Sequence, residues 1–287
     1  MTTFQVAIFS ILEALSSLIP ISNRAYSDFL KTFLDWPTPS VELKTLASGL
    51  TTLVLIYFFR FDWLGIFSAI LKSIVKPKSL GNKDRTLDQQ IVLFLLIAAT
   101  PSILAQMAFR NQWISFSEEG VTHPLAMFFG AFLSMGIVQL GLNLNKRIRG
   151  LNHLRLLDGV WVGLLLLLSG HPAFSPVLLC FAGFAICHYH ADALLKYSFL
   201  LVTLQFLVQT LALGSEVHVG QIFHQLGFMN GVVATVLITT TAWITIENFQ
   251  KSFALNSFEG TFRFFRWFQL VLIMGYGVTL YFQRTNG

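Results

Sequence analysis

Residues 13–26 read Glu13-Ala-Leu-Ser-Ser-Leu-Ile-Pro-Ile-Ser-Asn-Arg-Ala-Tyr26, and they interrupt a segment that is otherwise apolar from Val6 onward. In a bilayer, a proline followed by hydroxyls and an arginine is tolerated only where the chain is buried in protein or lines a wet cavity. Glu13 is the only acidic residue before Asp28, so we expect it to mark a functional site. The alternative is an ordinary first helix over residues 4–21 that ends at Pro20.

The composition of the chain sets its class. Of its 287 residues, 54% are hydrophobic and only 11% are charged, which is too apolar for a soluble domain of this length. We therefore predict an integral membrane protein. The net charge of +5 does not indicate nucleic-acid binding, because the cations lie in short loops between apolar segments. Cys180 and Cys187 lie in an apolar stretch and are expected to be buried small hydrophobes.

Some segments are long enough as helices to cross a hydrocarbon core of about 30 Å. These predicted spans are Val41–Phe59, Gln90–Phe109, Pro124–Leu144, Tyr197–Leu213, Phe228–Ile246 and Phe264–Phe282. Three other apolar pieces are too short or too broken, namely Val6–Ile21, Asp158–Gly170 and Val177–Cys187. Trp63–Val75 is also short, carries Lys72 and is typical of an amphipathic helix at the membrane interface.

The loops predict the orientation of the spans. Many of the cations lie between the first two spans or directly after the third: Arg60, Lys72, Lys76, Lys78, Lys83, Arg85, Lys146, Arg147, Arg149 and Arg155. Two crossings separate these loops, so they share a side, and the positive-inside rule assigns that side to the cytoplasm. Both termini are then predicted to lie outside.

This topology gives the broken segments a meaning. A hairpin over residues 4–37, turning near Pro20, and another over 158–188, turning near Pro172, would enter the membrane from opposite faces. Short broken segments at corresponding places in two halves indicate an inverted repeat with its site at the midplane. We therefore predict one membrane domain over residues 1–287. It is an all-α polytopic bundle of six spanning helices and two re-entrant hairpins, with repeats at about 1–145 and 156–287.

Several motifs of the chain are similar to those of one family. Residues 13–26 resemble the first signature of the bacterial undecaprenyl pyrophosphate phosphatases, the bacitracin-resistance family. Asp158-Gly-Val-Trp-Val-Gly163 through Pro172-Ala-Phe-Ser-Pro176 resembles the second signature, and Tyr197-Ser-Phe-Leu-Leu201 resembles a downstream motif. Pro101 and Arg266 add support. The order and spacing of these motifs identify the chain as a divergent member.

This resemblance implies a multi-pass protein of the bacterial cytoplasmic (inner) membrane. Such a protein would hydrolyse undecaprenyl pyrophosphate to the monophosphate and recycle the cell-wall lipid carrier. It implies Glu13, Ser22 and Ser175 as catalytic residues. Four positions depart from the pattern: its second glutamate is Ser17, its second serine is Asn23, its histidine is Tyr26 and its phosphate-binding arginine is Pro176. A pyrophosphatase needs a base and cations near the phosphoryl oxygens, and proline cannot replace a guanidinium.

Other residues are candidates to compensate for these losses. The substrate-binding candidates are Ser17, Asn23, Arg24, Tyr26 and His171. Arg24 would contact phosphate, or alternatively it is a snorkelling cation at the interface. His171 would act as a base, or alternatively it bonds a backbone carbonyl at the hairpin tip. His188 and His190 do not share a helix face, so we predict no metal site there. Mg²⁺ or Ca²⁺ is expected only if hydrolysis is retained.

Three functional classes stay open at this stage. The first is a divergent enzyme that hydrolyses a polyprenyl pyrophosphate. The second is an inactive relative that still binds or translocates a polyprenyl phosphate, which an inverted repeat would suit. The third is a small-solute transporter or a structural membrane partner. The expected partners are the lipid carrier and the bilayer, with a homodimer as a candidate assembly and no nucleic acid.

Overall fold

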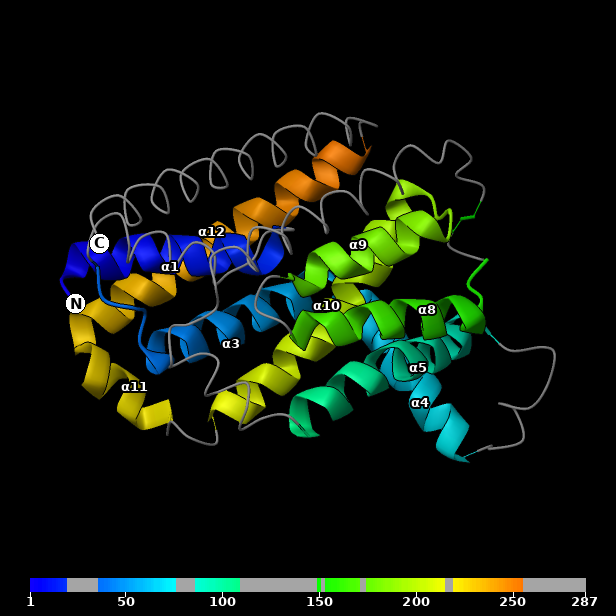
Figure 1. Cartoon of the computed structure of the whole chain (residues 1–287), viewed down its shortest axis with the longest axis horizontal. Helices are drawn as coiled ribbons and strands as arrows, with labels where there is room; N and C mark the ends of the chain where they lie inside the picture. The colour runs from blue at the N-terminus through cyan, green and yellow to red at the C-terminus, as the bar shows by residue number, and fades with distance from the viewer. Residues whose placement is uncertain are drawn as a thin grey trace, which may run out of the picture.

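Long apolar helices dominate the computed structural model, which describes residues 1–19, 36–75, 86–108, 149–150, 153–170, 174–214 and 219–254. Four of its helices are long and apolar enough to cross a membrane: α3 (Val41–Phe58), α5 (Leu87–Ala108), α10 (Ala191–Gly214) and α12 (Phe228–Ala254) (Figure 1). They correspond to four of the predicted spans. The other two, Pro124–Leu144 and Phe264–Phe282, lie outside the described residues. The chain is therefore a polytopic helical membrane protein.

The short apolar pieces form helices of 10–17 residues, which are shorter than the candidate spans. They are α1 (Thr3–Leu18), α8 (Leu156–Leu167), which continues into the 3₁₀ turn η2 (Leu168–Gly170), and α9 (Pro176–Ile186). Two further helices are α4 (Arg60–Val75) and α11 (Val219–Leu226). The prediction that residues 158–170 and 177–187 are separate short segments is confirmed.

Helix α4 covers the predicted interfacial segment and begins three residues earlier, directly after the Phe59 cap of α3. The buried residues of α4 are Ile66 and Ala69. Trp63 is partly buried against the core. Seven large apolar side chains of this helix are exposed: Phe61, Leu64, Phe67, Ile70, Leu71, Ile74 and Val75. An exposed apolar surface of this extent suits contact with lipid.

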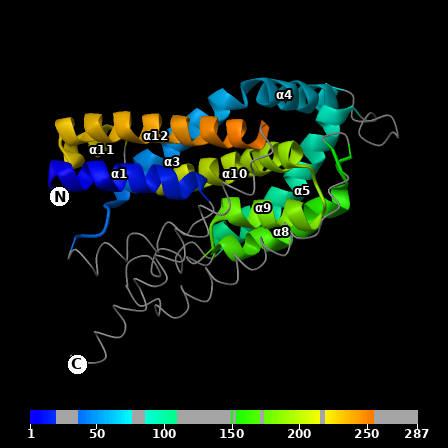
Figure 2. The ribbon, with the colours of Figure 1, turned by 90° about the horizontal axis from the view of Figure 1, so that it is seen from above.

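Helix α1 and the α8–α9 pair approach each other from opposite ends of the molecule. Figures 1 and 2 show α1 in one half of the long axis and α8 with α9 in the other, and the last turn of α1 points at the first turn of α9. Helix α10 packs against α9 and also against α3, which in turn packs against α1. Residues 20–35, the predicted return of the first hairpin, lie outside the described residues, and the inverted repeat stays a prediction.

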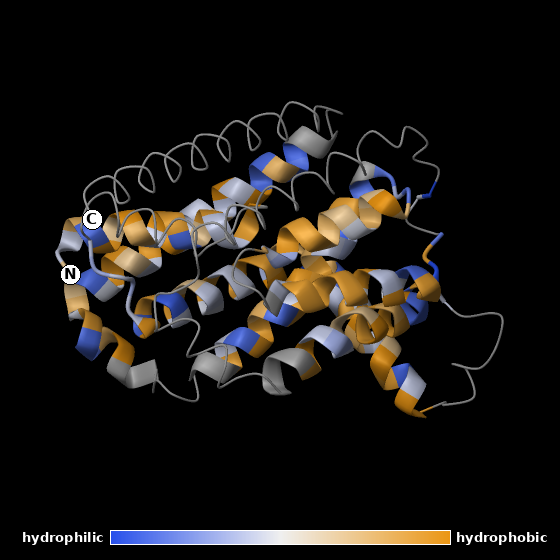
Figure 3. Ribbon diagram, in the orientation of Figure 1, coloured by the Kyte–Doolittle hydropathy of each residue, from blue (hydrophilic) through white to orange (hydrophobic). Residues whose placement is uncertain are grey.

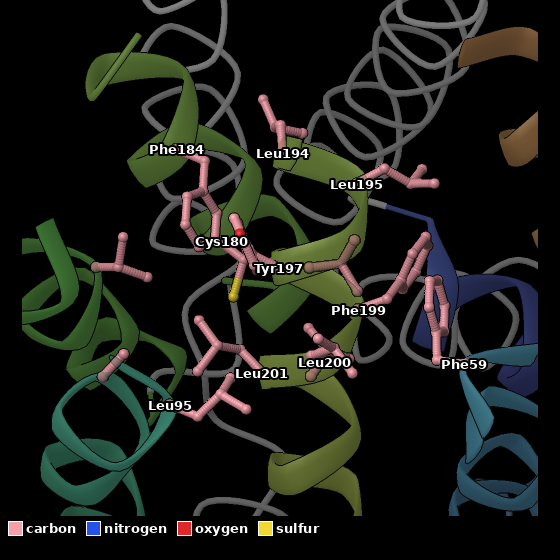
Figure 4. Packing of buried hydrophobic residues seen from close by; sticks show 14 of the residues in the cluster. Phe59, Leu95, Cys180, Phe184, Leu194, Leu195, Tyr197, Phe199, Leu200 and Leu201 are labelled. Carbon is pink, nitrogen blue, oxygen red and sulfur yellow. The ribbon is translucent and has the colours of Figure 1, made fainter. Parts of the chain in front are cut away.

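The core is built around α10. Tyr197, Phe199 and Leu201 are fully buried there, and Figure 4 shows Leu201 beside Leu95 of α5 and Tyr197 near Cys180 of α9. Ring contacts fix the helix levels: the Phe94 ring lies 5.6 Å from Phe184 and 6.1 Å from Tyr197, and Phe181 lies 5.9 Å from Phe199. The Phe184–Tyr197 and Phe181–Phe199 contacts make α9 antiparallel to α10. The Phe94–Tyr197 contact and the hydrogen bond between Ser102 and Gln205 make α5 parallel to α10.

Two glycines one turn apart bring α8 close to α5. A Cβ atom on Gly163 would lie 3.0 Å from the Ala98 carbonyl oxygen, and one on Gly159 would lie 3.0 Å from the Phe94 ring. Such a pair of glycines four residues apart allows helix backbones to pack directly in a membrane. The outer side of α8 carries exposed apolar residues such as Trp161 and Leu164, in keeping with the orange ribbon in Figure 3.

Candidate functional site

Helix α1 carries the first part of the site. It starts with a capping box, in which the Thr2 hydroxyl accepts from the Gln5 amide and the Gln5 side chain accepts from the Thr2 amide. Near its other end, Glu13 is only 3% exposed, so its carboxyl group does not face lipid. The Ser17 hydroxyl donates to the Glu13 carbonyl oxygen at 2.6 Å, which places the two residues one turn apart on α1.

The start of α9 carries the second part. Ser175 is the N-cap residue of α9, and Pro176 occupies the first helical turn, where its missing amide costs no helix bond. The Ser175 hydroxyl does not cap its own helix. Instead it donates to the carbonyl oxygen of Ile19, the C-cap residue of α1, at 3.5 Å. Segments about 156 residues apart in sequence are thereby joined.

Of the predicted site residues, the structure describes Glu13, Ser17 and Ser175. Glu13 and Ser17 lie on the last turns of α1, and Ser175 touches the end of that helix. Along the α1 axis, Glu13 stands about 9 Å from Ile19. The remaining candidates, Ser22, Asn23, Arg24, Tyr26 and His171, lie outside the described residues.

The opposite end of the α8–α9 hairpin holds an ionic cluster that the sequence analysis did not include in the site. Asp158 accepts from the Arg149 guanidinium at 2.8 Å and from the Tyr189 hydroxyl at 2.8 Å. Arg149 also pairs with the α9–α10 connection through its backbone, since its amide donates to the His188 carbonyl and its carbonyl accepts from the His190 amide. This cluster closes the base of the hairpin.

The base cluster is tightly packed. Tyr189 is fully buried, and its ring stands edge-on to Phe184 at 5.4 Å. Burial, and secondarily its hydrogen bond to the Asp158 carboxylate, raise the pKa of the Tyr189 hydroxyl. In the sequence, Asp158 is visible only as the first residue of the second signature and Arg149 only as one cation of a loop. Neither feature indicates that the two side chains meet.

Few side chains in the described part of the chain could bind a metal ion together. Within the described ranges, no three His, Cys, Asp or Glu side chains come together as a metal-ligating group. Helix α1 carries a single carboxylate, that of Glu13. A hard cation such as Mg²⁺ keeps few protein ligands and is often shared with substrate phosphates. The described residues do not form a closed protein cage for such an ion, and the metal requirement stays a prediction.

Long apolar helices, together with shorter apolar helices of which α1 and α9 meet end to end, define a polytopic helical membrane protein. The profile of the family described as Bacitracin resistance protein BacA matches residues 6–275. The chain belongs to this family, as the motifs predicted.

Curated relatives carry a common name. The chain is 27% identical over 179 residues to the "Undecaprenyl-diphosphatase" of Thermomicrobium roseum, covering 61% of this chain and 63% of that protein. It is 22% identical over 210 residues to that of Chlorobaculum tepidum, covering 70% and 71%. With that of Chlorobium phaeovibrioides it shares 28% identity over 114 residues, covering 39% and 38%. The alignments with the first and third of these span less than two thirds of the relatives' length.

Proposed function

We propose that this protein binds the phosphate headgroup of a polyprenyl diphosphate or monophosphate where α1 ends and α9 begins. The observation that carries the proposal is the hydrogen bond from Ser175 to the Ile19 carbonyl, because it joins the two signature segments of the family. The names of the relatives support undecaprenyl diphosphate as the substrate class.

The local electrostatics suit an anion on the α9 side of this junction. A helix start presents unpaired backbone amides and a partial positive charge, a combination that binds phosphate. Helix α9 begins at this place, with Ser175 as its cap and Pro176 in its first turn. The Ile19 carbonyl would repel phosphate, but the Ser175 hydroxyl donates to it. The Glu13 carboxylate would favour a bound ion or a protonated phosphate.

We further propose that binding is retained more fully than hydrolysis. Glu13 and Ser175 are present, whereas Ser17 and Pro176 stand where the family pattern has a glutamate and an arginine. Loss of a general base commonly costs ~10²–10⁴-fold in rate. Loss of one charge-stabilising donor costs a further ~10²–10³-fold. We therefore expect weak phosphate release, with an inactive lipid-phosphate binder as the second candidate function.

The test uses the purified full chain in liposomes with a long-chain prenyl diphosphate. Phosphate release is measured with and without Mg²⁺ or Ca²⁺, and lipid binding is measured in parallel on the wild type and on Glu13→Ala. We expect the wild type to bind the lipid, to release phosphate slowly, and to lose that release in Glu13→Ala. Robust release that survives Glu13→Ala would refute this site.

The setting of the site is part of the same proposal. We propose the bacterial inner membrane, with both termini on the outer side, because of the distribution of Lys and Arg among the loops. Cysteine-accessibility labelling of residues added at each terminus of the chain in intact cells would test this orientation. Labelling of either terminus only after the cells are opened would contradict it.

A further inference from the structure

A buried polar pair lies in the helix bundle apart from the signature residues. Gln205 of α10 and Ser102 of α5 are each 1% exposed, and the Gln205 side-chain amide donates to the Ser102 hydroxyl at 2.6 Å. The Ser102 hydroxyl is also within 3.1 Å of the Ala99 carbonyl oxygen, to which it donates. The amide nitrogen and the serine hydroxyl are therefore both paired.

The Gln205 side-chain oxygen is different. It is buried and has no hydrogen-bond partner among the described residues. Turning the amide over would pair that oxygen with Ser102, but the serine would then give up its bond to Ala99 and the amide nitrogen would lose its acceptor. An unpaired buried acceptor costs more than a typical hydrogen bond gains. This oxygen is thus suited to accept from a group that is not part of the described chain.

Two other buried hydroxyls without partners, on Thr51 and Ser198, do not carry the same implication. A hydroxyl in a helix reaches a carbonyl one turn back by rotating about its side-chain bond. The Gln205 oxygen is an acceptor only, and the amides of a helix interior already pair within the helix. Of these three groups, it is the one that needs an outside donor.

Helix geometry places Gln205 at the level of the α1–α9 junction. The rings of Phe94, Phe184 and Tyr197 are in mutual contact and mark one level across α5, α9 and α10. Ser102 lies about 12 Å along α5 from Phe94, and Gln205 lies about 12 Å along α10 from Tyr197. Ser175 lies about 13 Å along α9 from Phe184, and because α9 is antiparallel to α10, it lies on the same side of the ring level. Tyr197, Leu201 and Gln205 recur at helical spacing on one side of α10, and Figure 4 shows Leu201 beside Leu95 of α5.

We propose that Gln205, oriented by Ser102, is a positioning residue that accepts a hydrogen bond from an O–H group at the lipid headgroup. The donor is either a protonated phosphoryl oxygen or a water molecule that bridges to the phosphate. This inference rests on the proposed binding of a polyprenyl phosphate. It adds a contact from α5 and α10 that the two signature segments do not supply.

The test compares Gln205→Met with the matched control Gln209→Met, which changes an exposed glutamine one turn along the same helix. Methionine keeps the length of the side chain, and Ser102 keeps its bond to Ala99. The ligands are a long-chain polyprenyl monophosphate and the corresponding alcohol. We expect Gln205→Met to weaken monophosphate binding about tenfold at pH 6.5, with alcohol binding unchanged and Gln209→Met like the wild type.

The pH profile separates the two donors. The second ionisation of a phosphate monoester lies near pH 6. If the phosphoryl group itself donates, the difference between wild type and Gln205→Met shrinks toward pH 9; if water donates, it persists. Ser102→Ala, which frees the amide, should show a smaller loss of the same kind and serves if Gln205→Met does not fold.

Equal monophosphate affinity in wild type and Gln205→Met at every pH would overturn this inference and leave the proposed function intact. A wild type that does not prefer the monophosphate to the alcohol would instead overturn the proposed function.

Discussion

The two ends of the α8–α9 hairpin differ in the strength of the hydrogen bonds that Asp158 accepts at one end and Ser175 donates at the other. At the base, Asp158 accepts two hydrogen bonds of 2.8 Å, one of them from Arg149. At the tip, Ser175 makes one contact of 3.5 Å to the end of α1. Buried polar groups that are fully paired fix a structure, whereas weakly paired groups are available to a ligand. The base therefore holds the hairpin in place, whereas the weak contact of Ser175 leaves its hydroxyl available to the ligand that we propose there.

The largest effect is expected from restoring the family's residues in the two signature segments, which meet where Ser175 bonds to Ile19. In the variant Ser17→Glu/Tyr26→His/Pro176→Arg, a second carboxylate, a base and a phosphate-binding cation return to the family's positions. We expect phosphate release from a prenyl diphosphate to rise by ~10²-fold or more. The same variant in a Glu13→Ala background is the control and should lose the gain. An unchanged rate in the folded variant would show that the tip no longer has catalytic geometry.

Removing the Asp158 carboxylate from the base of the α8–α9 hairpin should lower the stability of the protein. Asp158→Ala leaves the Arg149 guanidinium without its carboxylate and leaves the buried Tyr189 hydroxyl only its longer bond to the His153 carbonyl oxygen, at 3.3 Å. We expect this loss to lower the free energy of unfolding by about 2–3 kcal/mol. The measurement is SDS-induced unfolding in detergent micelles. Glu247→Ala breaks an exposed ion pair with Lys251 on α12 and should change nothing measurable. Similar unfolding of the two variants would show that the base does not hold the hairpin.

Between base and tip, the hairpin is held against α5 by glycine contacts. Gly163→Ala puts a Cβ atom 3.0 Å from the backbone oxygen of Ala98, so the helices must separate. We expect a loss of about 1–3 kcal/mol in the same unfolding assay. Gly150→Ala meets nothing within 4 Å and is the matched control. If Gly163→Ala is as stable as Gly150→Ala, the close approach of α5 and α8 is not a packing requirement.

The smallest effect concerns the ionisation of the Tyr189 hydroxyl at the base of the α8–α9 hairpin. Burial and the Asp158 carboxylate raise the pKa of Tyr189, so the folded protein favours the neutral phenol. This contribution to stability is fully present below the unfolded pKa of about 10 and is lost only as pH rises through the higher folded value. The absorbance of tyrosinate at 295 nm should be the same in wild type and Tyr189→Phe up to about pH 10. A difference step at or below that pH would contradict the packing of the base.

Sequence reasoning succeeded where local composition decides structure. The four described spans, the short helices α8 and α9, and the break between them follow from segment length, apolar content and proline, which act within a few turns of chain. It also identified the family from the order of its motifs. It did not foresee the Arg149–Asp158–Tyr189 cluster, because the Tyr189 hydroxyl comes to Asp158 only after α9 folds back along α8.

The sequence alone therefore determined that this protein spans a membrane, where its helices break, and which family it belongs to. The tertiary structure decided which polar groups meet. Ser175 bonds to the end of α1, and Gln205 bonds to Ser102 across about 103 residues. A hydrogen bond depends on distances of a few tenths of an ångström and on helix register. Register is set by the packing of Phe94, Phe184 and Tyr197 from three helices, and no stretch of sequence contains that information by itself.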